Sequence, residues 1–270
     1  MRAGSVKVIG TVAAAVAVAL AVASSGYARQ APVAQQRRTV DGKPDLSGVW
    51  QAFTTATWNL QGHNAEKGMP GGQGIVEGVE IPYQPWAAAK KAENYKNRMK
   101  ADPVRKCFMP GVPRMNYMPF PFQIVQSPTI TVMTYEYNHM VRWIPTDGSR
   151  HPEALDFWMG DSRGRWEGDT FVVDVSNNND ETWFDGAGNF HSDALHVVER
   201  YTLMGANHLN YEATIEDPKV FTRPWKIRFP LYRRLEKNVQ VLDYECNQFE
   251  SKFLAWDEVP APGLPSPPGR

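Results

Sequence analysis

The chain has 270 residues and carries 29 Lys and Arg against 29 Asp and Glu, so its formal net charge is zero. This balance argues against nucleic-acid binding, which normally needs a basic face. Its 21 Gly, 21 Pro, 9 Trp, 10 Tyr and 12 Phe favour a turn-rich β protein over a helical one.

Residues 1–28 have the pattern of a secretory signal peptide. Two basic residues precede the apolar run Val8–Ala23, and small residues then fit a cleavage site before Arg29. The alternative is a membrane anchor, but the run is shorter than the roughly 20 residues that a span needs. We therefore expect a periplasmic or secreted protein with no stable membrane insertion after signal cleavage.

Roughly 240 residues follow the expected cut, enough for one large domain. We expect a linker over 29–42, because this stretch is polar and has no periodicity. A single β-barrel domain is predicted over 43–258, and the Pro-rich residues 259–270 are expected to form a tail. Nothing in the sequence specifies an oligomeric state.

The elements before residue 129 are one strand, one helix and long loops. Asp45–Ala52 is expected to form the first strand, and the glycine-rich residues 62–82 are expected to form a loop. Trp86–Met99 is the one convincing helix, with Pro85 near the position that helix starts favour and a solvent-facing composition. Residues 110–128 contain too many prolines for a helix.

From Thr129 onwards the chain has the pattern of antiparallel strands joined by tight turns. Thr129–Ile144 is a long strand or a hairpin. The other predicted strands are Leu155–Met159, Gly164–Trp166, Thr170–Val175, Leu195–Met204, Leu209–Glu216, Trp225–Leu231 and Val239–Phe249. Short strands in sequence order predict a meander that closes into a barrel.

The two cysteines, Cys107 and Cys246, are expected to form a disulfide. In an exported chain an isolated pair usually becomes bonded. The alternatives are two buried thiols, or a reactive cysteine, for which no C-x-x-C motif is present.

The residues DLSGVW, ending at Trp50, resemble the Gly-x-Trp entry of the lipocalin and wider calycin barrels. In those folds the Trp plugs the closed end of the barrel against an Arg from the last strand. The resemblance implies an all-β, antiparallel calycin-like (lipocalin-like) barrel, to which the residues of this chain add one surface helix and long ordered loops. It also implies that Trp50 is a buried plug rather than a ligand contact.

The chain from Gly42 to about Phe249 also resembles a large family of uncharacterised exported proteins of environmental bacteria. The matching pieces include GKPDLSGVW, PFPFQIVQSP, WMGDSRGRWEGDT and FHSDALHVVERY. This resemblance implies fold and export more than it implies a particular chemistry.

The block Trp158–Arg200 is the strongest indication of a site, because titratable groups and aromatics gather on segments between its strands. On the predicted strand Leu195–Met204, Glu199 shares a face with apolar residues and is expected to point inward. A buried carboxylate needs a partner or a raised pKa. Glu199 is therefore either an acid–base or cation-binding group, or half of a structural ion pair with Arg142 or Arg223.

Two histidines are the predicted proton carriers. His139 shares a strand face with Tyr135, Tyr137, Val141 and Trp143, an aromatic wall with one imidazole. His191 is followed by Asp193, which could orient it. His191, Asp193, His196 and Glu199 could alternatively supply metal ligands, but their spacing matches no standard motif, and we predict no metal.

We predict an exported enzyme that uses side-chain acid–base chemistry, with no cofactor, on a small apolar or aromatic substrate. The reaction would be that of a lyase, isomerase, cyclase or hydrolase. The alternatives are a lipocalin-like carrier of a small hydrophobic ligand and a metal-dependent hydrolase. The candidate catalytic residues are His139, His191, Asp193, Glu199, Asp161 and Arg142, and the candidate substrate-binding residues are Tyr135, Tyr137, Trp183, Trp225 and Arg223. His139 and His191 are expected to share one cavity, with Asp161, Asp193 or Glu199 hydrogen-bonded to one of them.

Overall fold

A computed structural model describes residue 1 and residues 37–246. The expected signal peptide, the first part of the expected linker and the Pro-rich tail lie outside the described residues. No helix of the described part is long and apolar enough to cross a membrane.

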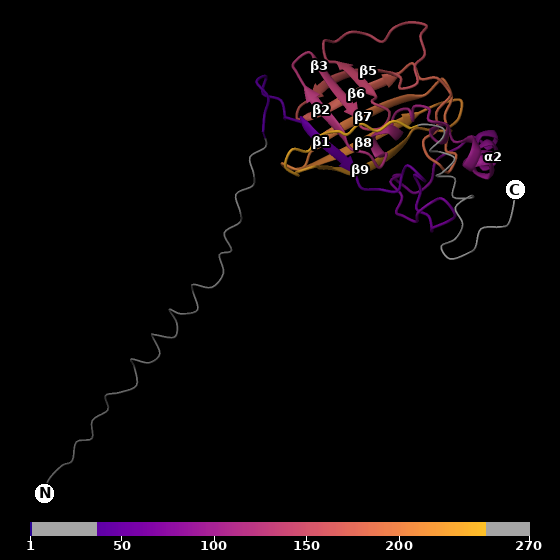
Figure 1. The fold of residues 1–270 in the computed structure, drawn as a ribbon, viewed down its shortest axis with the longest axis horizontal. Helices are drawn as coiled ribbons and strands as arrows, with labels where there is room; N and C mark the ends of the chain where they lie inside the picture. Colours follow the sequence, from indigo (N-terminus) through magenta and orange to yellow (C-terminus); the bar gives the residue numbers. More distant parts are fainter. Residues whose placement is uncertain (2–36, 247–270) are drawn as a thin grey trace, which may run out of the picture. The chain divides into compact units, whose positions relative to one another are not determined.

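The described residues form a nearly closed, nine-stranded antiparallel barrel, as the sequence predicts (Figure 1). The strands are β1 (Gly48–Ala52), β2 (Phe122–Gln126), β3 (Ile130–Tyr135), β4 (Val141–Pro145), β5 (Asp161–Glu167), β6 (Thr170–Ser176), β7 (His196–Leu203), β8 (His208–Glu216) and β9 (Trp225–Arg233). Each strand pairs with its sequence neighbours, apart from β4 and β5, and the pairing of β1 with β9 joins the two runs.

The alternation of residues along the strands determines which side chains enter the core. In β9, Trp225, Ile227 and Phe229 are buried while Lys226 and Arg228 between them are exposed. Successive strand residues point to opposite faces, so the apolar set lines the inside of the barrel. The predicted inward face of β7 follows the same rule.

The two ends of the barrel differ. The register places the short connections between β2 and β3, β5 and β6, and β7 and β8 at one end. The opposite end carries residues 53–121, including α2 (Pro85–Ala101), and the connection 177–195. Functional groups concentrate on such long connections, which a rigid scaffold holds in place.

The seam between β4 and β5 has no backbone ladder. Arg142 Nε donates to Ser162 Oγ at 2.8 Å across it. The connection 146–160 joins the end of β4 at one end of the barrel to the start of β5 at the other. Side chains, rather than main-chain hydrogen bonds, therefore close the barrel here.

Trp50 is fully buried, as predicted. Its Nε1 donates to the Leu46 carbonyl at 2.8 Å, and the Arg233 guanidinium lies 4.2 Å from the ring centroid. Arg233 is the last residue of β9 and pairs with Trp50 across the β1–β9 ladder. The contact of this Trp with an Arg from the last strand is the one that the Gly-x-Trp entry implies.

Two predicted strands are absent from the structure, and one strand that it contains was not predicted. Leu155–Met159 is not a strand, and only Phe157 forms an isolated bridge, with Asn178. Residues 239–246 contain no strand, although Tyr244 bridges Tyr137. β2 was missed because prolines flank its five residues, and proline is tolerated just outside a strand. The helix prediction is confirmed, with Pro85 at its first turn.

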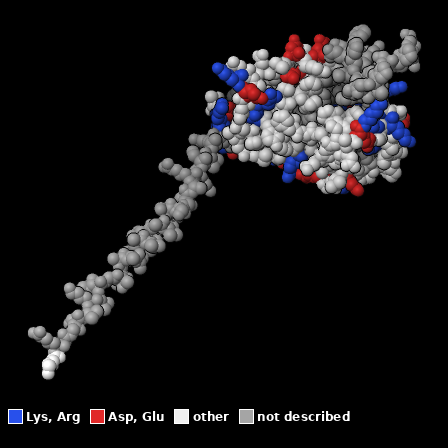
Figure 2. All heavy atoms as spheres, turned by 60° about the horizontal axis from the view of Figure 1, so that its bottom comes forward, with Lys and Arg blue, Asp and Glu red and all other residues white. Residues whose placement is uncertain are grey.

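The surface charge is mixed. Figure 2 shows Lys, Arg, Asp and Glu in small groups separated by wide neutral areas on the face that it draws. On that face the basic side chains form no continuous stripe.

Candidate functional site

Glu199 lies at the centre of a buried polar network inside the barrel. Its carboxylate pairs with Arg142 and accepts hydrogen bonds from Asn116 Nδ2 at 2.7 Å, Tyr211 OH at 2.8 Å and Tyr201 OH at 3.1 Å. Glu199 itself is 0% exposed. The inward orientation predicted for it is confirmed, and its partner is Arg142 rather than Arg223.

Burial determines the protonation of this network. Desolvation raises the pKa of Tyr201 and of Tyr211 well above the ordinary value, and it raises that of Tyr135 to about 12. Burial alone would lower the pKa of Arg142, but the Glu199 carboxylate raises it well above the usual range. The phenols remain neutral and the Arg142 guanidinium remains a cation, so its contact with the Glu199 carboxylate gives the network the character of a structural ion pair.

His191 is buried in the connection between β6 and β7. Its Nδ1 lies 2.9 Å from the Ser192 carbonyl and therefore donates, so Nε2 accepts from Thr182 Oγ1 at 2.7 Å. Burial lowers its pKa below the usual value, which keeps the ring neutral. Asp193 instead binds Lys219 at 2.5 Å on the surface. The predicted His191–Asp193 pair is therefore wrong.

The predicted wall around His139 is also wrong. Tyr135 and Tyr137 are buried, but Trp143 is 63% exposed and Val141 also faces outward. A tight turn separates β3 from β4, and Tyr135 pairs with Met140 by a main-chain hydrogen bond of 2.9 Å. The reversal changes which residues alternate inward, and this change places Arg142 in the barrel.

The turn itself is unusual at His139. Asn138 and His139 both have positive φ, 54° and 51°, as type I′ turns require at their central residues. Asn tolerates this region and Gly is preferred at the second position. A histidine there has a local cost of about 1–2 kcal/mol.

His139 lies at an open groove of about 420 Å³ on the outside of the barrel. Its Nε2 is 2.9 Å from Asp243 Oδ1, and the two side chains are 49% and 90% exposed. The groove is lined by Gln123, Thr134, Tyr135, His139, Gln240, Val241, Leu242 and Asp243. Two predicted site residues, Tyr135 and His139, thus share a concave surface, while His191 is not part of its lining.

A second group of imidazoles and carboxylates lies on the outer face of β5, β6 and β7. His151 Nδ1 is 2.6 Å from Asp161 and its Nε2 is 2.9 Å from Asp174. His196 Nε2 is 3.1 Å from the other oxygen of Asp174. The hydrogen bond from His196 lowers the pKa of Asp174, and the same bond raises the pKa of His196.

The expected hydrogen bond from Asp161, Asp193 or Glu199 to His139 or His191 is therefore not formed. Asp161 instead binds His151 and Arg163. His151 and Asp174 are not among the residues that the sequence predicts for a site. Asp174 alternates with buried valines on β6, which indicates that it faces outward. No local sequence pattern indicates that His151 lies against it.

The remaining predicted residues do not converge. Trp225 packs in the core against Phe184 and Phe221, Trp183 bridges Phe190, and Arg223 is exposed. His191, Asp193, His196 and Glu199 each have different partners. Between residues 37 and 246 no group of three or more His, Cys, Asp or Glu side chains is arranged to hold a metal ion.

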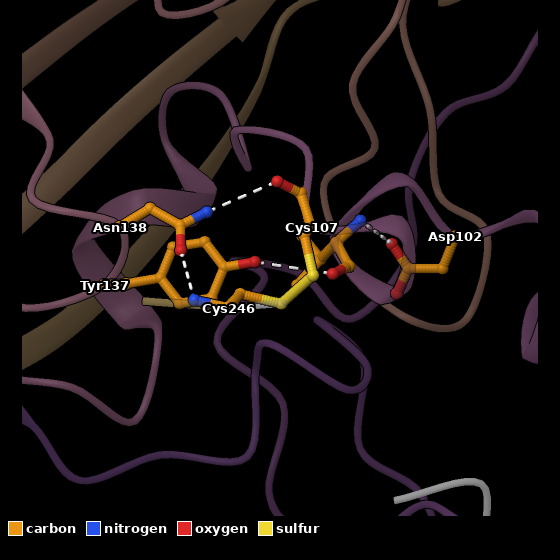
Figure 3. Close-up of a disulfide and its surroundings, with 6 residues drawn as sticks. Asp102, Cys107, Tyr137, Asn138 and Cys246 are labelled. Carbon is orange, nitrogen blue, oxygen red and sulfur yellow. Dashed lines mark hydrogen bonds between the residues drawn. A yellow bond between two sulfur atoms is a disulfide. The ribbon is translucent and has the colours of Figure 1, made fainter. Parts of the chain in front are cut away.

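The predicted disulfide is present. Cys107 and Cys246 are bonded with their Cα atoms 5.4 Å apart, and the bond lies beside the β3–β4 turn (Figure 3). Comparison with known proteins finds no matching family model, no similar curated protein and no similar solved structure.

Proposed function

We propose that this protein is an exported enzyme that transfers protons on a small molecule bound in the groove beside His139. The observation that carries the proposal is the placement of His139. A histidine occupies a left-handed turn position that favours glycine, and its imidazole lies against a carboxylate at the groove. Backbone strain at such a position is a reason to infer a use for the side chain.

The two groups suit general acid–base chemistry. When Nε2 carries the proton and faces Asp243, the Nδ1 of the neutral ring is a free acceptor. Nδ1 would take a proton from the substrate, and the nearby carboxylate would stabilise the imidazolium. The proton would then return to another atom of the isomerised product, or pass to the departing group in a lyase reaction. A lyase or isomerase reaction of this kind balances without a cofactor.

The lining indicates the kind of substrate. Gln123, Thr134 and Gln240 offer hydrogen bonds, while Val241 and Leu242 offer apolar surface. A small, partly apolar molecule with one or two hydrogen-bonding groups matches this combination. The groove therefore predicts a substrate that carries polar groups, in addition to the apolar or aromatic part that the sequence predicts.

The test is a panel of enolisable ketones, lactones and chromogenic esters, assayed with the wild type and with His139→Gln. We expect the variant to lose about 10²–10⁴-fold in kcat, the usual contribution of a positioned acid–base group. Asp243→Asn should lose less, because it removes only the carboxylate. Glu236→Gln is the control, since Glu236 pairs with Arg234 on the surface.

Undiminished turnover in His139→Gln would reject the assignment. A compound that shifts the NMR signals of His139 but is never turned over would instead identify a carrier. This outcome would favour the lipocalin-like alternative.

A further inference from the structure

The wall of the groove that bears Asp243 is not a strand. Residues 240–246 form no strand, and Leu242 and Asp243 are exposed. The next residue, Tyr244, packs against Phe120 and Tyr137, and Leu242 N donates to Glu136 Oε2 at 3.0 Å. The position of Asp243 beside His139 therefore depends on such individual contacts and on further hydrogen bonds from the β3–β4 turn.

Asn138 makes three of these contacts. Its backbone N–H donates to the Tyr244 carbonyl at 2.9 Å. Its Oδ1 accepts from Cys246 N at 2.7 Å, and its Nδ2 donates to the Cys107 carbonyl at 3.3 Å (Figure 3). Asn138 immediately precedes His139. One residue thus joins the turn, the wall and the disulfide.

The disulfide fixes the wall to a rigid support. Cys107 follows the 3₁₀ turn Pro103–Lys106, whose preceding residue Asp102 accepts from Val104 N at 3.1 Å. Asp102 also forms a buried ion pair with Arg114, with both guanidinium–carboxylate contacts at 2.8 Å. A bidentate buried pair of this kind holds its geometry well.

We propose that the Cys107–Cys246 disulfide and Asn138 form a clamp that positions Asp243 against His139. The consequence for catalysis rests on the proposed function, whereas the positioning itself does not. The cysteines and Asn138 are positioning residues: none of them lines the groove. They act by fixing the segment that carries Asp243.

The experiment compares ¹⁵N-labelled wild type with the double variant Cys107→Ser/Cys246→Ser and with Asp243→Asn. We expect the backbone order parameters of Leu242 and Asp243 to fall from the rigid value of about 0.85 to below about 0.6 in the double variant. The imidazole ¹⁵N shifts of His139 should move in the direction that Asp243→Asn moves them. A role in stability alone would change neither quantity in the native state.

Asn138→Gly is the second variant, for use if the double variant does not fold. Glycine accepts the positive φ at 138, so the turn is retained while the two side-chain contacts are lost. We expect smaller changes of the same kind in both readouts, and none in Glu236→Gln. Wild-type order parameters and imidazole shifts in whichever variant folds would overturn the clamp.

The two proposals fail in different ways. If the imidazole shifts change in the double variant but His139→Gln keeps full turnover, the clamp stands and the catalytic role of His139 is rejected. If turnover depends on His139 but the shifts are insensitive to the disulfide, the clamp is rejected and the function stands.

Discussion

At the scale of single residues, Glu199 and Arg142 show how burial selects between roles for the same side chain. A carboxylate inside a barrel could act on a ligand or pair with a cation. Here the guanidinium, an amide and two phenols surround it, and all of them are buried. Nη1 of Arg142 has no hydrogen-bond partner among the described residues, so the network is tightly packed but not fully satisfied.

Breaking this pair from one side should destabilise the protein. Arg142→Met leaves the Glu199 carboxyl buried without its cation, and we expect a loss of about 3–5 kcal/mol in the free energy of unfolding. The double variant Arg142→Met/Glu199→Gln removes both charges and should recover much of that loss. Urea unfolding of the wild type, Arg142→Met, Glu199→Gln and the double variant measures these values. A loss in the double variant equal to the sum of the two single losses would show that the charges do not interact.

Residue positions also explain which sequence predictions were right. The inward face of β7 follows from strict alternation in an eight-residue strand, and alternation is a local property. The strand face predicted for His139 is wrong because a tight turn between β3 and β4 interrupts the alternation. The sequence Tyr-Asn-His-Met has an Asn that suits a left-handed turn, but without Gly the signal for reversal is weak.

At the scale of elements, the outer group of His151, Asp161, Asp174 and His196 joins the connection 146–160 to three strands. His151 can donate to both Asp161 and Asp174 only when both of its ring nitrogens carry protons. Arg163 lies against Asp161, and Glu216 lies 3.6 Å from His196. The seam loop is thus held partly by ionisable groups.

This arrangement predicts a pH dependence of stability. The folded pKa of His196 is raised, so its contribution is complete below about pH 6.5, the ordinary pKa, and is lost as the pH rises through the folded value. The folded pKa of Asp174 is lowered, so its contribution is present above about pH 4 and is lost as the pH falls through the folded value. The combined contribution should be largest between these limits.

The measurement is the difference in unfolding free energy between the wild type and His196→Gln across this pH range. Buried His191 acts in the opposite direction, because it destabilises the protein when it must be protonated at low pH. His191 is present in both proteins, so its effect cancels and the difference in unfolding free energy reports the His196–Asp174 pair. A difference that does not decline above neutral pH would contradict the assigned interaction. His196 and Asp174 are part-exposed, so salt should reduce the effect.

At the scale of the whole molecule, the disulfide in the barrel protein is consistent with the export that the signal-peptide pattern predicts. The two bonded cysteines are the only ones in the 270 residues and lie 139 residues apart. Disulfides form in oxidising compartments, and a bond that closes so long a loop contributes about 5 kcal/mol in the chain-entropy model. We therefore expect export to allow the disulfide to form, and so to stabilise the fold, as well as to carry the protein to its compartment.

Expression of the full chain in a bacterium with a periplasm tests this expectation. We predict that the exported protein begins at Arg29, has no alkylatable thiol before reduction and has two afterwards. A version without residues 1–28 should remain in the cytosol with two free thiols and unfold at a lower temperature. Retention of residues 1–28 in the recovered protein would contradict the cleavage, and equal thermal stability would contradict the role of the bond.

The sequence alone determined the barrel, the surface helix and the inward orientation of Glu199, because periodicity, turn residues and burial preference act over a few neighbouring residues. The buried Trp50 was implied by the resemblance to the Gly-x-Trp entry. The sequence also specified the disulfide, since only two cysteines were available to pair. Tertiary structure alone decided that Glu199 meets Arg142, that Asp161 meets His151 and that Asp243 reaches His139. These contacts join residues between 10 and 104 positions apart. Barrel closure and the return of the chain after β9 set such distances, and no local pattern encodes them.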